Sequence, residues 1–170
     1  MQGGDYVLAD SSAICAYLEK QYPSPSFYPT TAEALGKALW FEEYADTALF
    51  QAIAPCYYQT VLAAPLYRNR RPDEDVINEA LAENFPPVAA YLEEQLCGKR
   101  YLVDEQFTIA DIAITSIFLN MYQSGYPVEH AKCPHLSTYL RQNFQPPSFQ
   151  SCIHDVNAEL ERARKLISYA

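Results

Sequence analysis

Residues 107–125, which read FTIADIAITSIFLNMYQSG, contain both a helix start and a helix stop. Thr108 and Asp111 have the spacing of a capping box, in which each side chain bonds to the backbone amide of the other residue. Gly125 is a favourable residue just past a helix end, and Pro127 prevents the helix from resuming. The stretch therefore predicts one helix that is closed at both ends.

The interior of this helix predicts that it is buried. Residues 108–124 contain no Lys, Arg or Glu. Apolar side chains lie on every side of the helical wheel: Ile109, Ile112, Ile114, Ile117, Phe118, Leu119, Met121 and Tyr122. A helix that is apolar all round is surrounded by other elements, and this one is too short and too polar for a membrane span. We therefore expect the central helix of an all-helical bundle, with Asp111 acting as a cap in preference to a catalytic acid.

The composition describes a folded and acidic chain. Its 170 residues are enough for one domain with a sizeable core, and 49% of them are hydrophobic. The net charge is −9 and the sequence pI is about 4.7, which argues against nucleic acid and anionic membranes as partners. Arg68, Arg70 and Arg71 form one basic cluster. We interpret it as a solvated loop, with an anion-binding loop as the alternative.

The cysteine pattern favours a cytoplasmic protein with reduced thiols. Five cysteines are scattered along the chain without a CxxC motif. The N-terminus has no signal-peptide pattern, and no apolar run reaches membrane length. His130, Cys133 and His135 stand close together, but their spacing matches no common zinc site, so no metal is expected.

The N-terminal residues predict a strand without a sheet. Residues 3–5 (Gly-Gly-Asp) are typical of a turn, and residues 6–8 (Tyr-Val-Leu) follow as a short strand. Too few residues precede the turn for a proper first strand. Because an unpaired strand edge seeks a partner, we expect residues 1–9 either to be disordered or to pair with another chain.

The next segment predicts a helix and then a linker. Asp10, Ser11 and Ser12 place a carboxylate and two hydroxyls at a helix start, and this helix ends before Pro23. Residues 22–31, YPSPSFYPTT, are a proline-rich connector and the best candidate for a domain boundary.

Four further helices are expected, two of which contain proline in their interior. The apolar periodicity of residues 32–64 predicts a long helix that Pro55 kinks near Gln51. Residues 73–96 predict another helix, and Pro86-Pro87 should break or strongly kink it by forcing Phe85 away from helical angles. Shorter helical patterns follow at 134–143 and 148–167, the latter with a charged second half that should face solvent.

In this order, the motifs resemble those of the cytosolic glutathione transferases. Over residues 5–156, five features occur in the family's order. They are DSSAICAYLEKQYP, a proline linker, a long helix, YLVDEQFTIADIAI and QPPSFQSCI. The resemblance implies an all-α fold class: a glutathione transferase C-terminal-like helical bundle, preceded by a remnant strand and helix of a thioredoxin-like domain. It implies a remnant of the thioredoxin-like domain over 1–22, a linker over 23–31 and the C-terminal helical domain over 32–170.

The resemblance also implies a site. The acid-Ser pair with which this family holds the γ-glutamyl end of glutathione maps onto Asp10 and Ser11; the residues alone indicate plain helix caps. A carboxylate can hold an ammonium group, and a hydroxyl with free helix amides can hold a carboxylate. Tyr44 and Tyr122 are candidates for the wall of a hydrophobic substrate pocket. Glutathione is then a substrate beside a hydrophobic small molecule, and the protein is a homodimer.

Some family features are missing from this sequence. We find neither the family's thiol-stabilising Ser, Tyr or Cys nor its cis-proline, so we expect the chain to begin after both and to hold no catalytic residue. Asp104 replaces the family's usual Gly after Tyr-Leu-Val. Cys15 lies near a helix start among apolar neighbours, which indicates a core residue.

Two hypotheses for function follow. The chain is part of an enzyme that conjugates or exchanges glutathione with hydrophobic electrophiles; the alternative is a non-catalytic scaffold or interaction module. Phosphate-binding glycine loops, nucleophile elbows and HExxH motifs do not occur in the sequence, so the residues offer no third chemistry.

Overall fold

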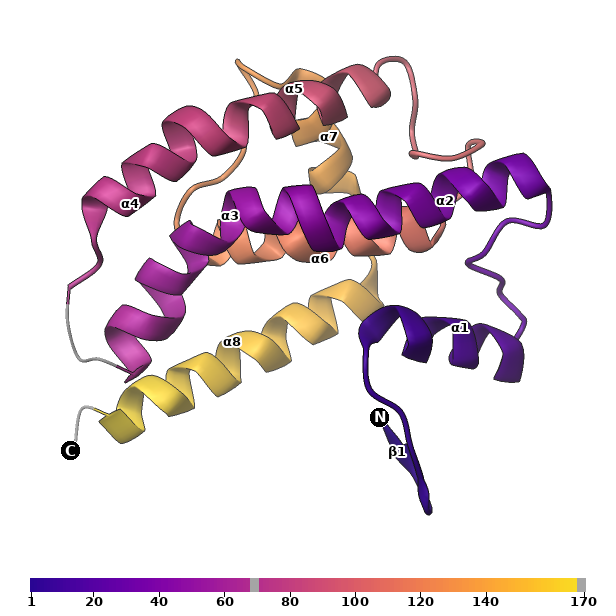
Figure 1. The fold of residues 1–170 in the computed structure, drawn as a ribbon, viewed down its shortest axis with the longest axis horizontal. Coiled ribbons are helices and arrows are strands. Elements are labelled where there is room, and N and C mark those ends of the chain that lie inside the picture. The colour runs from indigo at the N-terminus through magenta and orange to yellow at the C-terminus, as the bar shows by residue number, and fades with distance from the viewer. Residues whose placement is uncertain (68–70, 168–170) are drawn as a thin grey trace.

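The computed structural model describes residues 1–67 and 71–167 and is mainly helical there (Figure 1). The elements are β1 (Gln2–Gly3), β2 (Tyr6–Val7), α1 (Ser11–Gln21), α2 (Ala32–Tyr44), α3 (Phe50–Tyr57), α4 (Glu74–Glu79), α5 (Phe85–Gln95), α6 (Ile109–Gln123), α7 (Pro134–Asn143) and α8 (Pro147–Ile167). Three π-helical segments join them: η1 (Ala45–Leu49), η2 (Tyr58–Tyr67) and η3 (Ala80–Asn84). The all-α fold class is confirmed.

Helix α6 is the centre of the bundle, as its sequence predicts. It packs along α2, η1 and α3, and it also touches α7; Figure 1 shows it running beside the long α2–α3 helix. Ile114, Thr115 and Phe118 of α6 are fully buried. The largest buried side chains around it come from other elements and include Phe41, Leu49, Ile53, Leu92, Leu96, Leu136 and Leu140.

A buried carboxylate fixes the start of α6. Thr108 and Asp111 form a capping box, and the amide of Thr108 donates to Asp111 Oδ2 at 2.8 Å. The other oxygen, Oδ1, accepts from the Leu102 amide at 3.1 Å and from the Tyr139 hydroxyl of α7 at 2.9 Å. Burial raises the pKa of Asp111, although its hydrogen bonds oppose that shift. One side chain therefore joins a loop, the start of α6 and α7.

The turn before α6 adopts a left-handed backbone without glycine. Asp104 and Glu105 have φ values of 46° and 54°, and the Gln106 amide donates to the Val103 carbonyl at 3.0 Å. Two consecutive positive φ values with that bond describe a type I′ turn. Asp104 thus occupies, at a cost of roughly 1 kcal/mol, a conformation that favours Gly.

The helix containing Pro86 and Pro87 is not broken, so the predicted break is wrong. Phe85 keeps helical angles of φ −74° and ψ −41°, and Figure 1 shows α4 and α5 as one continuous course. A proline ring meets the carbonyl of the residue four positions earlier. For both prolines that carbonyl belongs to the wider π-helical segment η3, which is where the strain is relieved.

The long helix predicted from residue 32 onwards agrees better with expectation than the helix with Pro86 and Pro87. Residues 32–67 form the uninterrupted series α2, η1, α3 and η2. Pro55 lies inside α3, and the ribbon in Figure 1 bends in that region. In the predicted basic loop, Arg71 is exposed, whereas Arg68 and Arg70 lie outside the described residues.

The N-terminal strand pairs within its own chain, so the expectation that it is disordered and lacks a first strand is wrong; pairing with another chain stays a prediction. Strand β2 runs antiparallel to β1, with Gln2 opposite Val7. The Met1 ammonium donates to the Leu8 carbonyl at 2.9 Å. Gly4, at φ 61°, permits a turn tight enough for two very short strands. The hairpin is exposed and contacts α1 through the Tyr6 and Tyr17 rings, whose centroids are 5.4 Å apart.

The proline-rich connector holds α1 against α6. Glu19 of α1 accepts from the Ser26 hydroxyl at 2.5 Å and from the Phe27 amide at 3.0 Å. The carbonyl of Phe27 accepts from the amide of Ile109, the first residue of α6, at 2.9 Å. The rings of Phe27 and Phe107 also meet edge to face, 6.1 Å apart. These contacts orient α1 relative to the bundle.

The first prediction concerns the buried carboxylate. Asp111→Ala should lower the free energy of unfolding by at least about 2 kcal/mol, because several buried donors lose their acceptor. Tyr139→Phe removes one donor and should cost about 1 kcal/mol. Ser116→Ala, an exposed hydroxyl on the same helix, is the control and should change stability by less than about 0.5 kcal/mol. Urea unfolding curves for all three variants that overlay the parent would contradict the role assigned to Asp111.

The second prediction concerns pH. Slight burial of the Glu19 carboxyl acts to raise its pKa, but hydrogen bonds from Ser26 and Phe27 outweigh it. The pKa of Glu19 is therefore lowered below its ordinary value. A carboxyl whose folded pKa is lowered stabilises the fold above its unfolded pKa, about 4.3, and loses that contribution as the pH falls through the folded value. Glu19→Gln should therefore destabilise the protein most at neutral pH and least in acid. Glu161→Gln, exposed on α8, should show no such trend; identical profiles for the two variants would refute the prediction.

Candidate functional site

The N-terminus of α1 combines an exposed acid with a strained backbone. Asp10 is the N-cap, and its Oδ1 accepts from the Ala13 amide at 3.0 Å. Its backbone lies at φ 73° and ψ 132°, a region that residues other than Gly rarely occupy. Ser11 follows as the first helical residue, and both side chains are exposed. Strained residues of this kind concentrate at binding and catalytic sites.

Further carboxylates surround the start of α1. The pKa of Cys15 is raised by burial and then by the charges of Glu42, Asp10 and Asp46. The pKa of Asp46 is likewise raised by burial and then by Asp10 and Glu43. The Asp10 carboxylate therefore faces acidic groups of α2 and η1, and this region has a negative potential that suits a cation.

The thiol and the phenol beside this site hold their protons firmly. Cys15 is half-buried and packs against the core, which agrees with the sequence-based interpretation. Burial and the nearby carboxylate of Glu42 raise the pKa of Tyr28. Glu42 is itself only 6% exposed. Neither Cys15 nor Tyr28 has the lowered pKa of an activated nucleophile or base.

The two tyrosines predicted to line a substrate pocket belong to different aromatic clusters. Tyr44 lies against Tyr91 of α5, with ring centroids 4.9 Å apart, and near Trp40 at 6.3 Å. Tyr122, near the end of α6, meets Phe144 edge to face at 5.0 Å. Burial is the first cause that raises the pKa of both tyrosines.

Two cavities were not predicted from the sequence. One, of about 290 Å³, lies between α1, the connector and α6, and Cys15, Leu18 and Ile112 help to line it. The other, of about 1000 Å³, lies between α5 and the α6–α7 connection. Neither Tyr44 nor Tyr122 lines either cavity. Their walls come from segments far apart in the sequence, so no local motif could indicate them.

Metal-binding and membrane-spanning features are not seen in the described ranges. Among residues 1–67 and 71–167, no cluster of three or more His, Cys, Asp or Glu side chains is arranged to hold a metal ion. His130 and His135 are exposed. In the same part of the chain, no helix has the length and apolar character needed to cross a membrane.

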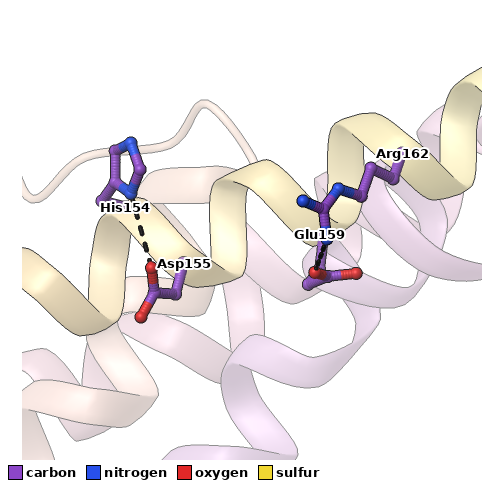
Figure 2. Close-up of polar contacts among 4 residues, drawn as sticks. All are labelled: His154, Asp155, Glu159 and Arg162. Carbon is purple, nitrogen blue, oxygen red and sulfur yellow. Dashed lines mark hydrogen bonds and ion pairs between the residues drawn. The ribbon is translucent and has the colours of Figure 1, made fainter.

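The outer face of α8 carries exposed polar pairs rather than a site. Figure 2 shows His154 beside Asp155, at 3.4 Å, and Arg162 on Glu159. All four side chains are more than two-thirds exposed. Pairs so open to water contribute at most about 1 kcal/mol to stability, so this surface adds little to the stability of the fold.

Comparison with known proteins identifies relatives of this chain in sequence and in structure. The model of the glutathione S-transferase C-terminal domain family matches residues 49–147. Glutathione S-transferase 1 of Zea mays is 28% identical over 151 residues, which cover 88% of this chain and 69% of that protein. Elongation factor 1-gamma of Schizosaccharomyces pombe is 30% identical over 110 residues, or 65% of this chain and 25% of that protein.

A solved structure agrees with the sequence relatives. The structure of glutathione S-transferase-I bound with the ligand lactoylglutathione has a TM-score of 0.80 and 23% sequence identity. The match covers 90% of this chain and 72% of that one. The family model spans more than half of the chain, and the helical arrangement agrees with it. The chain therefore belongs to the cytosolic glutathione S-transferase family, and it contains that family's all-helical C-terminal domain.

Proposed function

We propose that the chain is part of a cytoplasmic glutathione transferase and that Asp10 and Ser11 hold the γ-glutamyl end of glutathione. The observation that carries this proposal is the exposed, strained Asp10 at the N-terminus of α1. Family membership supplies the reaction class, in which the glutathione thiol adds to or exchanges with a hydrophobic electrophile. The five cysteines of the chain are free thiols, which fits a reducing compartment.

The charges around α1 suit a zwitterionic γ-glutamyl group. The Asp10 carboxylate, reinforced by Glu42 and Asp46, favours the ammonium group. The Ser11 hydroxyl and the first amides of α1 favour the carboxylate, because a helix N-terminus carries partial positive charge. Both ends of the ligand's amino acid group thus find opposite charge within one turn of helix.

These residues bind glutathione but do not activate its thiol. Thiol activation needs a group that stabilises the thiolate, whereas burial raises the pKa of Cys15, Tyr28 and Tyr44. Tyr44 and Tyr122 remain our candidates for contact with the second substrate, since each combines a half-exposed aromatic body with a polar tip. They lie in separate aromatic clusters and would therefore contribute separate apolar surfaces.

A homodimer is part of the proposal. Leu39 and Trp40 of α2 are 45% and 54% exposed, and the Trp40 indole donates to the Tyr91 hydroxyl of α5 at 3.1 Å. Gly36 lies one turn before Trp40, and a Cβ added there would meet open space. Exposed apolar surface that spans two helices marks an interaction site, and a second copy of the chain is the occupant we propose.

The third prediction is that the 170-residue chain binds glutathione weakly and does not conjugate it. A few charge-assisted bonds offset by the cost of ordering a flexible tripeptide leave about 4 kcal/mol, or a Kd of about 1 mM. Glutaryl-cysteinyl-glycine, which lacks only the ammonium group, should bind more weakly. Asp10→Asn keeps a good N-cap and should abolish this difference between the two ligands.

NMR titration with both ligands, beside a conjugation assay at neutral pH, tests this prediction. Asp5→Asn, an exposed acid in the hairpin, is the matched control and should leave the preference for glutathione intact. Micromolar binding, or turnover that survives loss of both Asp10 and Ser11, would place the site elsewhere. If neither ligand binds at 10 mM, about ten times the expected Kd, the glutathione-binding role assigned to Asp10 and Ser11 is wrong. That result would favour the alternative, a non-catalytic scaffold or interaction module.

The fourth prediction concerns self-association. Trp40→Lys should shift sedimentation equilibrium from dimer towards monomer by at least about tenfold in dissociation constant, because a central aromatic anchor is replaced by a charge. Phe50→Lys, at a position 45% exposed on the same long helix, should leave the dimer unchanged. A parent chain that remains monomeric at high concentration, or equal effects of both variants, would rule out this interface.

A further inference from the structure

The cavity of about 1000 Å³ lies away from the proposed glutathione site. All of its lining residues come from positions 81–135, in η3, α5, the turn after α5, the end of α6, the α6–α7 connection and the start of α7. None belongs to α1 or α2. The volume is at the upper end of the range found for small-molecule sites.

The wall of this cavity is mainly apolar and partly rigid. Ala89, Met121 and Val128 contribute to it and are themselves 3%, 3% and 7% exposed. Phe85 and Tyr126 add aromatic surface and pack against the core. Because Ala89 and Met121 are held by α5 and α6, the cavity is preformed by the bundle. Its chemistry suits a ligand with a hydrophobic body.

The place where an anion could bind is already occupied. Glu93 of α5 lines the cavity, and its two oxygens accept from the amides of His135 and Leu136 at 2.9 and 2.8 Å. Those amides belong to the first turn of α7, which is where a helix attracts negative charge. The carboxylate of Glu93 therefore takes the role that a ligand's carboxylate or phosphate would have.

The remaining charges around the cavity are net negative. Lys132 is paired with Glu129 at 2.7 Å, so its charge is compensated. Glu94 lines the same cavity and is exposed. With Glu93, Glu94 and Glu129 facing one lysine, a cationic ligand is attracted and an anionic one is repelled.

We propose that this cavity is a second small-molecule site, which binds hydrophobic amines through the apolar walls of α5 and α6 and the carboxylates at its rim. The site is independent of glutathione binding at Asp10 and Ser11. Its ligand class is opposite in charge to glutathione, whose net charge is negative. If the proposed transferase role is wrong, the proposal for this cavity still stands. If the cavity binds no amine, the proposed transferase role is unaffected.

The test uses two probes with one apolar body. Calorimetry should show that 4-phenylbutylamine binds the full chain at least about tenfold more tightly than 4-phenylbutyrate, since the carboxylates repel the acid. Ala90→Phe places a ring at an exposed position that lines the cavity and should weaken amine binding about tenfold or more by filling the space. Ala16→Phe, exposed on α1, should have no effect.

Charge is tested separately from shape. Glu94→Gln should weaken amine binding by about threefold, as expected for a carboxylate partly exposed to water. Glu83→Gln lies outside the cavity and is its control. Equal binding of amine and acid, absence of binding by either, or full affinity in Ala90→Phe would each overturn the proposal.

Cysteine labelling gives an independent readout. Cys97 and Cys133 line the cavity, whereas Cys152 is exposed on α8. Burial and the carboxylate of Glu93 raise the pKa of Cys133, so its labelling should be slow at neutral pH. 4-Phenylbutylamine should slow alkylation of Cys97 and Cys133 further and leave Cys152 unchanged. Equal protection of all three cysteines would indicate binding elsewhere.

Discussion

The structure depends on the carboxylate of Asp111. Burying a charged group is costly unless donors surround it, and the two oxygens of Asp111 accept from Leu102, Thr108 and Tyr139. Each donor comes from a different segment, so the cost of burial is offset only when the loop before α6, the start of α6 and α7 are all in place. The carboxylate thereby selects one arrangement of these elements, and α6 then organises the helices around it.

The proposed glutathione site depends on the same end of α6. The first amide of α6, at Ile109, bonds to the carbonyl of Phe27, and the amide of Phe27 bonds to Glu19 of α1. The chain of contacts runs from the buried capping box through the connector to the helix that carries Asp10 and Ser11. A ligand at α1 therefore meets a helix whose direction is set by the core, although none of its own side chains is fully buried.

Local signals in the sequence predict much of this fold. The capping box at Thr108 and the apolar interior predict α6, and Pro134 marks the first residue of α7. The effect of Pro86 could not be predicted, because the relief comes from a π-helical register in η3 that has no simple residue signature. The strain at Asp10 has no residue signature either, since residues other than Gly rarely adopt its backbone angles. The large cavity could not be predicted because its walls meet only in the folded chain.

The N-termini of α1, α6 and α7 differ in which group meets their partial positive charge. The start of α6 holds its own buried acid, Asp111, and that of α7 holds Glu93 from another helix. At α1 the cap, Asp10, accepts from Ala13, and Ser11 remains exposed beside it. The partial positive charge of a helix start is thus used internally at α6 and α7. At α1 the cap uses the Ala13 amide, but Ser11 beside it is exposed, and we assign a ligand's carboxylate to this helix start. The acid that fills the start of α7 instead turns the neighbouring cavity towards cations.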